Sequence, residues 1–594
     1  MAFDGIVTKA VTTELSCLCG ARIDKVFEPN KNEMILGLYL NGFNYALNIC
    51  IDAQNCRLNL TTHSKPNPQV APNFCMLLRK NLIGLKLNNI VTFDLERLII
   101  LEFEGFDELD DIISKKLVIE LMGKHSNIML LDDNNIIIDS LRHIKEFDEN
   151  YRDILPHTKY VFPTSDKANF LELSNFNAFY ECIVSNYPDI FEKNAINSLP
   201  VQLSSTFNGI SKNFIANIIN KYHTSIVDKD CLERIFNYIN TIIKNIGTDN
   251  LAFKNIVNSD GIIKDYFLIT DTEQNTEPDS DKTAESFNLN FYIDDFYYTK
   301  ETNESFKNYR NSLLKLILDT LKKYNKRLQH INEKLKECDD MDKYRIWGEL
   351  LTANLYRIPA KNVESVEVEN YYNNNNILVI KLDKKYLPSV NAKRFFKKYS
   401  KLKNALEIVS IQKKDTLKEL DYIESVVYEL ESATSINELL DIFEEISEND
   451  IFKEKTSKYK NKKKSKIKKS NLTKNKTVSF NPLKYTIDGY TILVGRNNRE
   501  NDYLSLKFAH KNDLWFHTKD IHGSHTILKI DSSMPYPDEE ILIKVAKIAA
   551  LHSKAKNSSN VPVDYCEVRF VKKPSGSKPG MVIYTNNKTL NVTP

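Results

Sequence analysis

A short segment in the first quarter of the sequence has the residue types of an anion-binding turn. After an apolar run that we predict to be a strand, Gly123, Lys124, Ser126 and Asn127 stand within five positions. Backbone amides and short polar side chains at the end of a strand can bind an anion such as a phosphate. A plain turn explains the same residues, so the spacing alone leaves both interpretations open.

An acid and a base stand side by side upstream of this segment. Glu96 and Arg97 lie between Leu95 and the apolar run Leu98–Leu101, in a stretch predicted to be a strand. Neighbouring residues of a strand point to opposite faces, so we expect Glu96 and Arg97 to have separate partners. On the residues alone, a structural pair at the entry of a strand is the simpler interpretation.

Near the C-terminus, three histidines and a serine could suggest catalysis. His517, His522 and His525 lack cysteine or carboxylate partners at a spacing typical of metal sites. Ser524 does not lie in a G-x-S-x-G motif, and residues 495–497 are not a Walker or Rossmann glycine motif. We therefore expect no catalytic residue, no metal and no cofactor.

A run of basic and aromatic residues favours a different chemistry. Between residues 391 and 404, aromatic residues are interleaved with cations, namely Phe395, Phe396 and Tyr399 with Lys393, Arg394, Lys397, Lys398, Lys401 and Lys403. Rings stack on bases and cations bind phosphates, so the run is typical of an RNA-binding surface. Alternatively, the aromatic side chains belong to a core and the lysines form a solvated face.

A second phosphate-binding candidate is a turn between two predicted helices. Phe207–Ile210, followed by Ser211 and a helix over 212–222, resembles a helix-hairpin-helix turn. In that motif, backbone N–H groups at a helix N-terminus bind a phosphate. A simple connection between helices is an equal alternative.

Two predicted helices with heptad repeats must position the basic run. Apolar residues recur every seven positions in two interleaved sets, Leu314, Leu321, Leu328 and Leu335 with Ile317, Tyr324, Ile331 and Cys338. Residues 402–430 repeat the pattern, with Lys413 as its break. Such a seam predicts a coiled coil, most economically an antiparallel pair with a small module at its tip. A four-helix bundle is the alternative, but the seam is narrow and the outer faces are charged.

At 594 residues, the chain should hold several domains. We expect an α+β multidomain fold with a mixed α/β N-terminal domain, a helix-hairpin-helix segment, a long antiparallel coiled-coil arm with a tip module, and an α+β C-terminal domain. The expected boundaries are 1–175 for the N-terminal domain, 176–270 for the helical segment, 271–304 for an acidic linker and strand, 305–340 and 405–447 for the arm, 341–404 for the tip module, 448–479 for a Lys-rich linker, and 480–594 for the C-terminal domain.

Charge is segregated along the chain although the net charge is only +2. Residues 381–418 hold twelve Lys or Arg against three Asp or Glu, and residues 453–476 hold twelve Lys against one Glu. Residues 265–305 are acidic instead, with eleven acidic side chains against two Lys. Blocks of this kind suggest that particular surfaces meet a polyanion.

The N-terminus and the cysteines bear on location. The first residues lack the basic and apolar regions of a signal peptide, and no apolar run approaches the length of a membrane span. The nine cysteines are scattered, as expected of reduced thiols. We therefore expect a cytoplasmic protein without a membrane partner.

The order of these segments and several whole strings resemble the NFACT family. The resembling strings are ELMGKHSNIMLLD (120–132), YRDILP (151–156), YRIWGELLTANLYRI (344–358), NAKRFFKKYSKLKNA (391–405) and GRNNRENDYLSLKFAHKNDLWFHTKDIHGSHTIL (495–528). Together they extend over essentially the whole chain. The resemblance implies an N-terminal NFACT domain, a coiled-coil arm with a middle module, and a C-terminal RNA-binding domain.

The resemblance also implies a function in ribosome quality control. Members of the family bind the large (50S) ribosomal subunit that still carries a peptidyl-tRNA with its nascent chain. They recruit a tRNA, alanyl-tRNA in bacteria, and promote template-independent addition of C-terminal alanines that mark the nascent chain for degradation. The ribosome makes the bond, so the factor acts by positioning rather than as an enzyme. The arm tip would reach the 23S rRNA and protein of the stalk base.

Particular residues inherit roles from the resemblance. The family has an Asp-Arg pair implicated in holding the tRNA anticodon region, which here corresponds to Glu96-Arg97 with a longer acid. Arg97 would contact a phosphate or base edge, and Glu96 would accept from a base amino group or orient Arg97. The implied tRNA-binding residues are Glu96, Arg97, Glu120, Leu121 and Met122. The implied RNA- or ribosome-binding residues are Lys124, His125, Lys393, Arg394, Lys397, Lys398, Lys401, Lys403, Arg496, Asn497 and His517.

Three other functions compete with this one. The domain order also resembles DNA glycosylases, but those need an N-terminal proline nucleophile and a zinc finger, and this chain begins Met1-Ala2. Bacterial family members are often labelled fibronectin-binding proteins, so a surface adhesin with fibronectin as partner is a second alternative. A general RNA-binding scaffold without tailing activity is the third.

Overall fold

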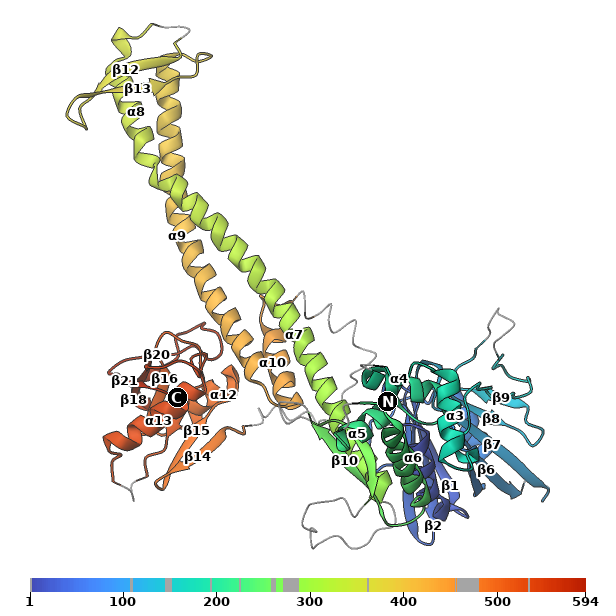
Figure 1. Ribbon diagram of the computed structural model, residues 1–594. Coiled ribbons are helices and arrows are strands. Elements are labelled where there is room, and N and C mark those ends of the chain that lie inside the picture. Colours follow the sequence, from blue (N-terminus) through green and yellow to red (C-terminus); the bar gives the residue numbers. More distant parts are fainter. Residues whose placement is uncertain are drawn as a thin grey trace. The chain divides into compact units, whose positions relative to one another are not determined.

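The computed structural model describes residues 3–106, 110–144, 152–192, 195–223, 226–257, 263–270, 288–359, 363–453, 456, 480–531 and 535–594 (Figure 1). The chain divides into two compact units, Met1–Thr302 and Asn303–Pro594, here called the N-terminal and C-terminal units. The acidic segment 271–287 and most of the predicted Lys-rich linker lie outside the described residues. The predicted class, an α+β multidomain protein, is confirmed.

The N-terminal unit is built on one antiparallel sheet with the strand order β4-β3-β2-β1-β5-β6-β7-β8-β9. Its strands are β1 (Arg22–Asn30), β2 (Glu33–Leu40), β3 (Phe43–Cys50), β4 (Arg57–Leu60), β5 (Lys86–Thr92), β6 (Leu98–Phe106), β7 (Ile112–Glu120), β8 (Asn127–Leu131) and β9 (Ile137–Ser140). Apolar residues of these strands pack against apolar residues of the helices and form one large core. The sheet thereby fixes the loops at its strand ends, where the candidate residues lie.

Helices and a hairpin complete the N-terminal unit. They are α1 (Gly5–Leu15), α2 (Asn73–Leu82), α3 (Phe176–Asn186), α4 (Ala195–Thr206), α5 (Lys212–Lys221), α6 (Lys229–Lys244), β10 (Leu251–Val257) and β11 (Ile263–Thr270). Rings of α3, α6 and the turn after α4 pack together, since Phe179 stacks on Phe207 at 5.1 Å and contacts Phe236 at 5.2 Å. Helix α7 (Asn288–Asp339) starts here, where Glu14 accepts from the amides of Leu289 and Asn290.

The arm belongs to the C-terminal unit. Helix α7 and helix α9 (Pro388–Ser432) run antiparallel, and the tip module between them contains α8 (Met341–Ala353), β12 (Ser365–Asn370) and β13 (Asn376–Lys381) (Figure 1). At the tip, Gly348 lets α8 approach α9, because a Cβ there would lie 2.9 Å from the Phe396 ring. The second arm helix therefore starts at Pro388 and includes the basic run, whereas the sequence predicted the run to precede it.

The arm is a coiled pair over its length and a three-helix bundle at its base. Of the predicted registers, Ile317, Ile331 and Cys338 are buried, while Leu314 and Leu321 are only half-buried. Helix α10 (Ile436–Glu448) packs beside α7 and α9 and widens the apolar stripe at the base. Because a third helix packs there, the buried residues at the base of the arm differ from those that a two-helix coiled coil would bury.

The C-terminal domain is a twisted sheet with the order β14-β15-β17-β16-β18-β21 and a helix on one face. Its elements are β14 (Leu483–Ile487), β15 (Tyr490–Val494), α12 (Asn498–Tyr503), β16 (Leu514–Thr518), β17 (Thr526–Leu528), α13 (Glu539–Leu551), β18 (Val561–Glu567), β19 (Val571–Lys572), β20 (Ile583–Tyr584) and β21 (Lys588–Val592). Strands β14 and β15 form a hairpin over Asp488-Gly489, and Asp538 caps α13 by accepting from the amide of Ile541 at 2.9 Å.

Candidate nucleic-acid interface

The acid–base pair lies in a turn and not on a strand as predicted. Strand β5 ends at Thr92 and β6 begins at Leu98, so Glu96 and Arg97 belong to the connection between them. Asp94 adopts a positive φ of 47°, and the amide of Glu96 donates to the carbonyl of Phe93 at 2.8 Å. Because a tight turn precedes β6, the prediction that Glu96 and Arg97 belong to the strand was wrong.

Two glycines bring other segments against this turn. A Cβ on Gly5 would lie 1.7 Å from the carbonyl oxygen of Leu95, and a Cβ on Gly209 would lie 2.1 Å from the same atom. The amide of Gly5 donates to the carbonyl of Gly209 at 2.9 Å. The start of α1, the turn before α5 and the acid–base turn therefore form one tightly packed junction.

The helix-hairpin-helix-like turn is part of this junction. Gly209 has a positive φ of 72° and packs its Cα face against Leu95. Ser211 caps α5 by accepting from the amide of Phe214 at 3.2 Å. The turn thus supports the Glu96-Arg97 segment and connects two helices.

Arg97 lies among acidic groups. Burial raises the pKa of Glu96, and the nearby cations Arg97 and Lys167 oppose that shift. Burial also raises the pKa of Asp4, a fully buried residue at the start of α1, while Ser211, the amide of Val7 and the charge of Arg97 oppose it. Arg97 is half-buried, so its guanidinium is positioned by neighbours and still accessible.

The second predicted tRNA-contacting segment adjoins the first through the backbone. Leu98 pairs with Glu120 in the sheet, and the amide of Leu121 donates to the carbonyl of Arg97 at 2.9 Å. Met122 is half-buried, and the following residues form a short 3-10 turn, Gly123–His125, with Lys124 and His125 exposed. The structure therefore brings both predicted segments together at one end of the central strands β5, β6 and β7.

Glu120 itself is closed off from solvent. It is 1% exposed, and its carboxylate accepts from both terminal nitrogens of Arg152 at 2.9 Å. The hydroxyl of Tyr160 donates to the same carboxylate at 2.7 Å. Leu121 is also fully buried. Neither side chain reaches solvent, so the direct tRNA contact expected of them does not fit this geometry, and their position supports the backbone of Arg97 and Met122 instead.

Two exposed aromatic side chains beside the turn were not predicted from the sequence. Phe93 is 39% exposed and Phe162 is 46% exposed. Their rings meet edge to face at 5.1 Å, and Phe162 also contacts Tyr160 at 5.2 Å. Sequence periodicity gave no signal for this pair, because the two residues are far apart in the chain and neither follows a strand or helix pattern.

The cations of the basic run are exposed on helix α9. Lys393, Arg394, Lys397, Lys398, Lys401 and Lys403 all face solvent. Their aromatic neighbours Phe395, Phe396 and Tyr399 are half-buried, and the Phe395 ring packs on Trp347 at 5.5 Å while Phe396 packs on Gly348. The ammonium of Lys398 lies 4.2 Å from the centre of the Tyr344 ring. The run is thus a helical surface of cations over an aromatic core.

The three candidates in the C-terminal domain have internal partners. Arg496 pairs with Glu438 of α10 at 3.1 Å. Asn497 caps α12, accepting from the amide of Glu500 at 2.8 Å, and Glu500 accepts in return from the amide of Arg496 at 2.8 Å. This capping box is visible in the sequence as Asn-x-x-Glu. The sequence analysis treated these residues as RNA contacts and did not recognise the cap.

His517 is packed in an aromatic group. Its ring stacks on Trp515 at 5.6 Å, and its Nε2 lies 3.3 Å from the carbonyl oxygen of Gly523. Burial lowers the pKa of His517 to about 4 and that of His525 to about 3, so both rings are neutral at pH 7. Neutral, packed rings of this kind are structural, and among the described residues no group of His, Cys, Asp and Glu has the arrangement of a metal site.

No helix among the described residues is long and apolar enough to cross a membrane.

Comparisons with known proteins cover the whole chain. Residues 4–466 match the family described as NFACT N-terminal and middle domains, and residues 476–586 match the NFACT protein RNA binding domain. The chain is 32% identical over 603 residues to Rqc2 homolog RqcH of Bacillus subtilis, covering 100% of this chain and 98% of that protein. It is 33% identical to Rqc2 homolog RqcH of Streptococcus suis, with the same coverage.

Solved structures resemble parts of the chain. The N-terminal part of a fibronectin/fibrinogen-binding protein from Streptococcus suis is 25% identical, covers 50% of this chain and 99% of that one, and has a TM-score of 0.38. The C-terminal part of the same protein is 30% identical, covers 49% of this chain and 95% of that one, and has a TM-score of 0.34.

Proposed function

Because the chain belongs to the NFACT family, we propose that it is a ribosome-associated quality-control factor. In this role it binds large ribosomal subunits that carry a stalled peptidyl-tRNA, in the cytoplasm, and recruits a tRNA to them. Its full-length similarity to proteins named Rqc2 homolog RqcH supports the proposal. We further propose that it promotes the template-independent addition of alanine from alanyl-tRNA to the nascent chain.

The factor acts as an adaptor. Peptide-bond formation belongs to the ribosomal peptidyl transferase centre, and the protein contributes by holding a tRNA in place, which lowers the entropic cost of the reaction. The observation that carries the proposal is the packed junction at one end of the central strands of the N-terminal sheet, where the amide of Leu121 donates to the carbonyl of Arg97 in the Glu96-Arg97 turn.

At this junction, Arg97 contacts a phosphate or base edge of the tRNA, and Glu96 accepts from a base amino group or orients Arg97. Phe93 and Phe162 extend the site, because exposed rings stack on unpaired bases such as those of an anticodon loop. Lys124 and His125 contact the backbone nearby. Glu120 does not contact the tRNA itself. Its hydrogen bonds with Arg152 and Tyr160 hold the end of β7, which precedes Leu121 and Met122.

The arm and the C-terminal domain supply the subunit contacts. The exposed cations on α9 bind phosphates of the 23S rRNA, and the tip module meets the protein of the stalk base. Arg496 becomes available to RNA only when it leaves Glu438, and Asn497 shapes the turn that presents it. His517 contributes through packing on Trp515. We do not propose the adhesin alternative, because no feature of the described residues favours it.

A native pull-down tests the proposal. The tagged protein is recovered from its own cells, and the accompanying RNA is sequenced. We expect large-subunit rRNA, little small-subunit rRNA and one enriched tRNA species, which would identify the amino acid. Recovery of both subunits equally at background level, or of no ribosomal RNA, would overturn the proposal.

A further inference from the structure

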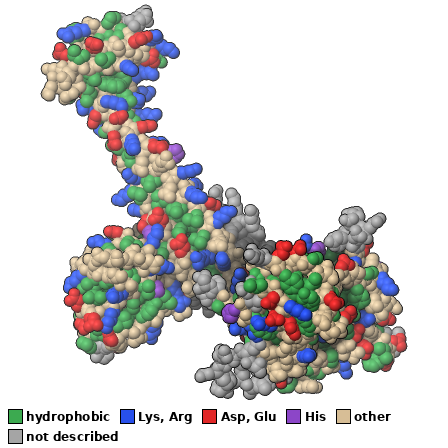
Figure 2. Space-filling model, viewed as in Figure 1, with side chains coloured by type: hydrophobic (Ala, Val, Ile, Leu, Met, Phe, Trp, Pro, Cys, Tyr) green, Lys and Arg blue, Asp and Glu red, His purple; other side chains and the backbone are tan. Residues whose placement is uncertain are grey.

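A groove along the middle of the arm has nine lining residues, of which five are Lys or Arg and one is an Asp. It has a volume of about 690 Å³ and lies on α7, with one residue contributed by α9. The lining residues are Asp319, Lys322, Lys323, Lys326, Arg327, His330, Ile331, Lys334 and Gln412. Figure 2 shows Lys and Arg side chains distributed along the arm. Like charges that are concentrated on a coiled coil repel one another and lower its stability, which suggests that they have a function.

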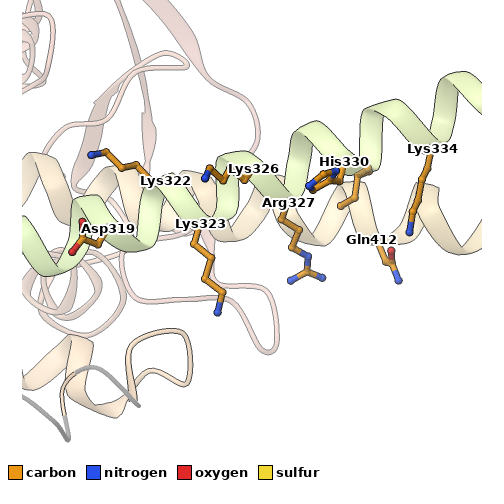
Figure 3. Close-up of a pocket in the computed structure, with 9 residues that line it drawn as sticks. Asp319, Lys322, Lys323, Lys326, Arg327, His330, Lys334 and Gln412 are labelled. Carbon is orange, nitrogen blue, oxygen red and sulfur yellow. The ribbon is translucent and has the colours of Figure 1, made fainter.

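The cations form two rows at helical spacing. Lys322, Lys326 and Lys334 lie on one side of α7 at spacings of four and eight residues, about 6 and 12 Å along the helix axis. Figure 3 shows Lys322 and Lys326 on one side of α7, with Lys323 and Arg327 on the other. Two rows of cations that flank a groove match the two-sided phosphate surface of a nucleic-acid backbone.

Internal acids neutralise little of this charge. Arg327 lies 3.8 Å from Glu419 of α9, and His330 lies 3.2 Å from Glu333, in pairs whose members are largely exposed. Lys322, Lys323, Lys326 and Lys334 are exposed and have no ion-pair partner among the residues that the structure describes. The row is therefore available to an external anion.

The groove continues into the basic surface of the tip. Lys334 and Gln412 also line a second groove of about 980 Å³, whose cations include Lys381, Arg394, Lys397, Lys398 and Lys401. The continuous surface extends from the middle of the arm to its outer end. A row of cations of this length fits a chain of phosphates, because a small anion would contact only one or two of the cations.

We propose that this cationic groove, residues 322–334 of α7 with Gln412 of α9, binds the phosphate backbone of double-stranded RNA along the arm. Along the shaft a duplex is favoured over a single strand, because none of the described residues lining this groove is Phe, Tyr or Trp, and single strands need rings to stack on. The tip groove differs, since Tyr344 and Phe395 are among its lining residues. A-form duplexes are recognised through their phosphates and shape. The inference deepens the proposed function by assigning RNA contacts to the shaft of the arm as well as its tip.

The test compares two matched triple variants of the full chain. Lys322→Gln/Lys326→Gln/Lys334→Gln removes one row, and Lys307→Gln/Lys315→Gln/Lys336→Gln removes three exposed lysines of the same helix outside the groove. The probe is a fluorescent RNA duplex of about 20 base pairs and mixed sequence, titrated at several salt concentrations. Equal helix content and melting temperature by circular dichroism establish that both variants are folded.

We expect the groove variant to bind the duplex about tenfold more weakly, with the slope of log Kd against log salt smaller by about 2 to 3, since each phosphate contact contributes roughly one unit. The control variant should keep at least most of the slope. Equal effects of both variants would overturn the inference, as would stronger binding of polyglutamate than of the duplex, which would assign the groove to an acidic protein.

Failure here differs from failure of the proposed function. If the duplex binds equally to both variants while the pull-down still recovers large-subunit rRNA, only the groove assignment is wrong. If the pull-down recovers no ribosomal RNA with the wild-type chain, the proposed function is wrong, whatever the duplex shows.

Discussion

Glu120 and Glu96 lie at neighbouring loops of the same sheet, and each has an arginine within reach, but the structure uses the two acids differently. Glu120 is buried and bonded to Arg152 and Tyr160. Glu96 lies half-buried in a turn beside Arg97 and two exposed rings. The first acid has all its partners inside the protein, whereas the second is the one that we propose to take part in tRNA binding. A buried, saturated pair holds the backbone in place, so an adjacent open pair can bind without rearranging.

Truncating the arginine of the closed pair should have the largest effect. Arg152→Ala leaves a buried carboxylate without its cation, and we expect a loss of about 3 kcal/mol of unfolding free energy in the N-terminal unit. Urea denaturation followed by circular dichroism measures it. Arg22→Ala is the matched control, because Arg22 pairs with Asp24 at an exposed site and should cost less than about 0.5 kcal/mol. Similar losses in both variants would remove the distinction between closed and open pairs.

Removing a ring from the open site should affect binding rather than folding. We expect Phe93→Ala to weaken tRNA binding by about 1 to 3 kcal/mol, the usual contribution of one stacked base. Filter binding with purified tRNA measures it. Phe43→Ala, at a ring that is 67% exposed on another strand, serves as control. Unchanged affinity of the Phe93 variant would exclude stacking at this ring.

The pH dependence of Glu96 should give the smallest effect. Burial raises the pKa of Glu96, so its carboxylate forms at a higher pH in the folded protein than in the unfolded chain, and this ionisation lowers stability as pH rises through the folded-state pKa. If the carboxylate accepts from a base, tRNA affinity should rise over the same interval although stability falls. Glu96→Gln should flatten both trends, by less than about 1 kcal/mol, whereas Glu104→Gln, at an exposed position of β6, should leave them in place. A pH profile that is identical in wild type and Glu96→Gln would contradict a role for this carboxylate.

Some of the architecture could be read from the sequence. The heptad repeat that includes Ile317 and Ile331 predicted the arm, because this pattern is local in the sequence. The partnership of Glu120 with Arg152 could not be read, since the two residues are 32 positions apart and no periodicity joins them. The same limit hid the contact between Phe93 and Phe162.

Residues of one type also differ in ways that only packing decides. Arg496 and Lys326 are both cations in polar surroundings, but Arg496 is held by Glu438 of α10 while Lys326 lines an open groove. From the sequence, Arg496 was predicted to contact RNA, and no role was predicted for Lys326. Only the docking of α12 against the base of the arm distinguishes them.

The most direct test of the account is the pull-down repeated with Arg97→Ala beside wild type and Arg22→Ala. We predict that Arg97→Ala loses the enriched tRNA but keeps large-subunit rRNA, because the arm supplies subunit binding separately. Equal loss of tRNA and subunit RNA, or retention of the tRNA at the wild-type level, would contradict the central claim that the Glu96-Arg97 turn is the tRNA-binding site.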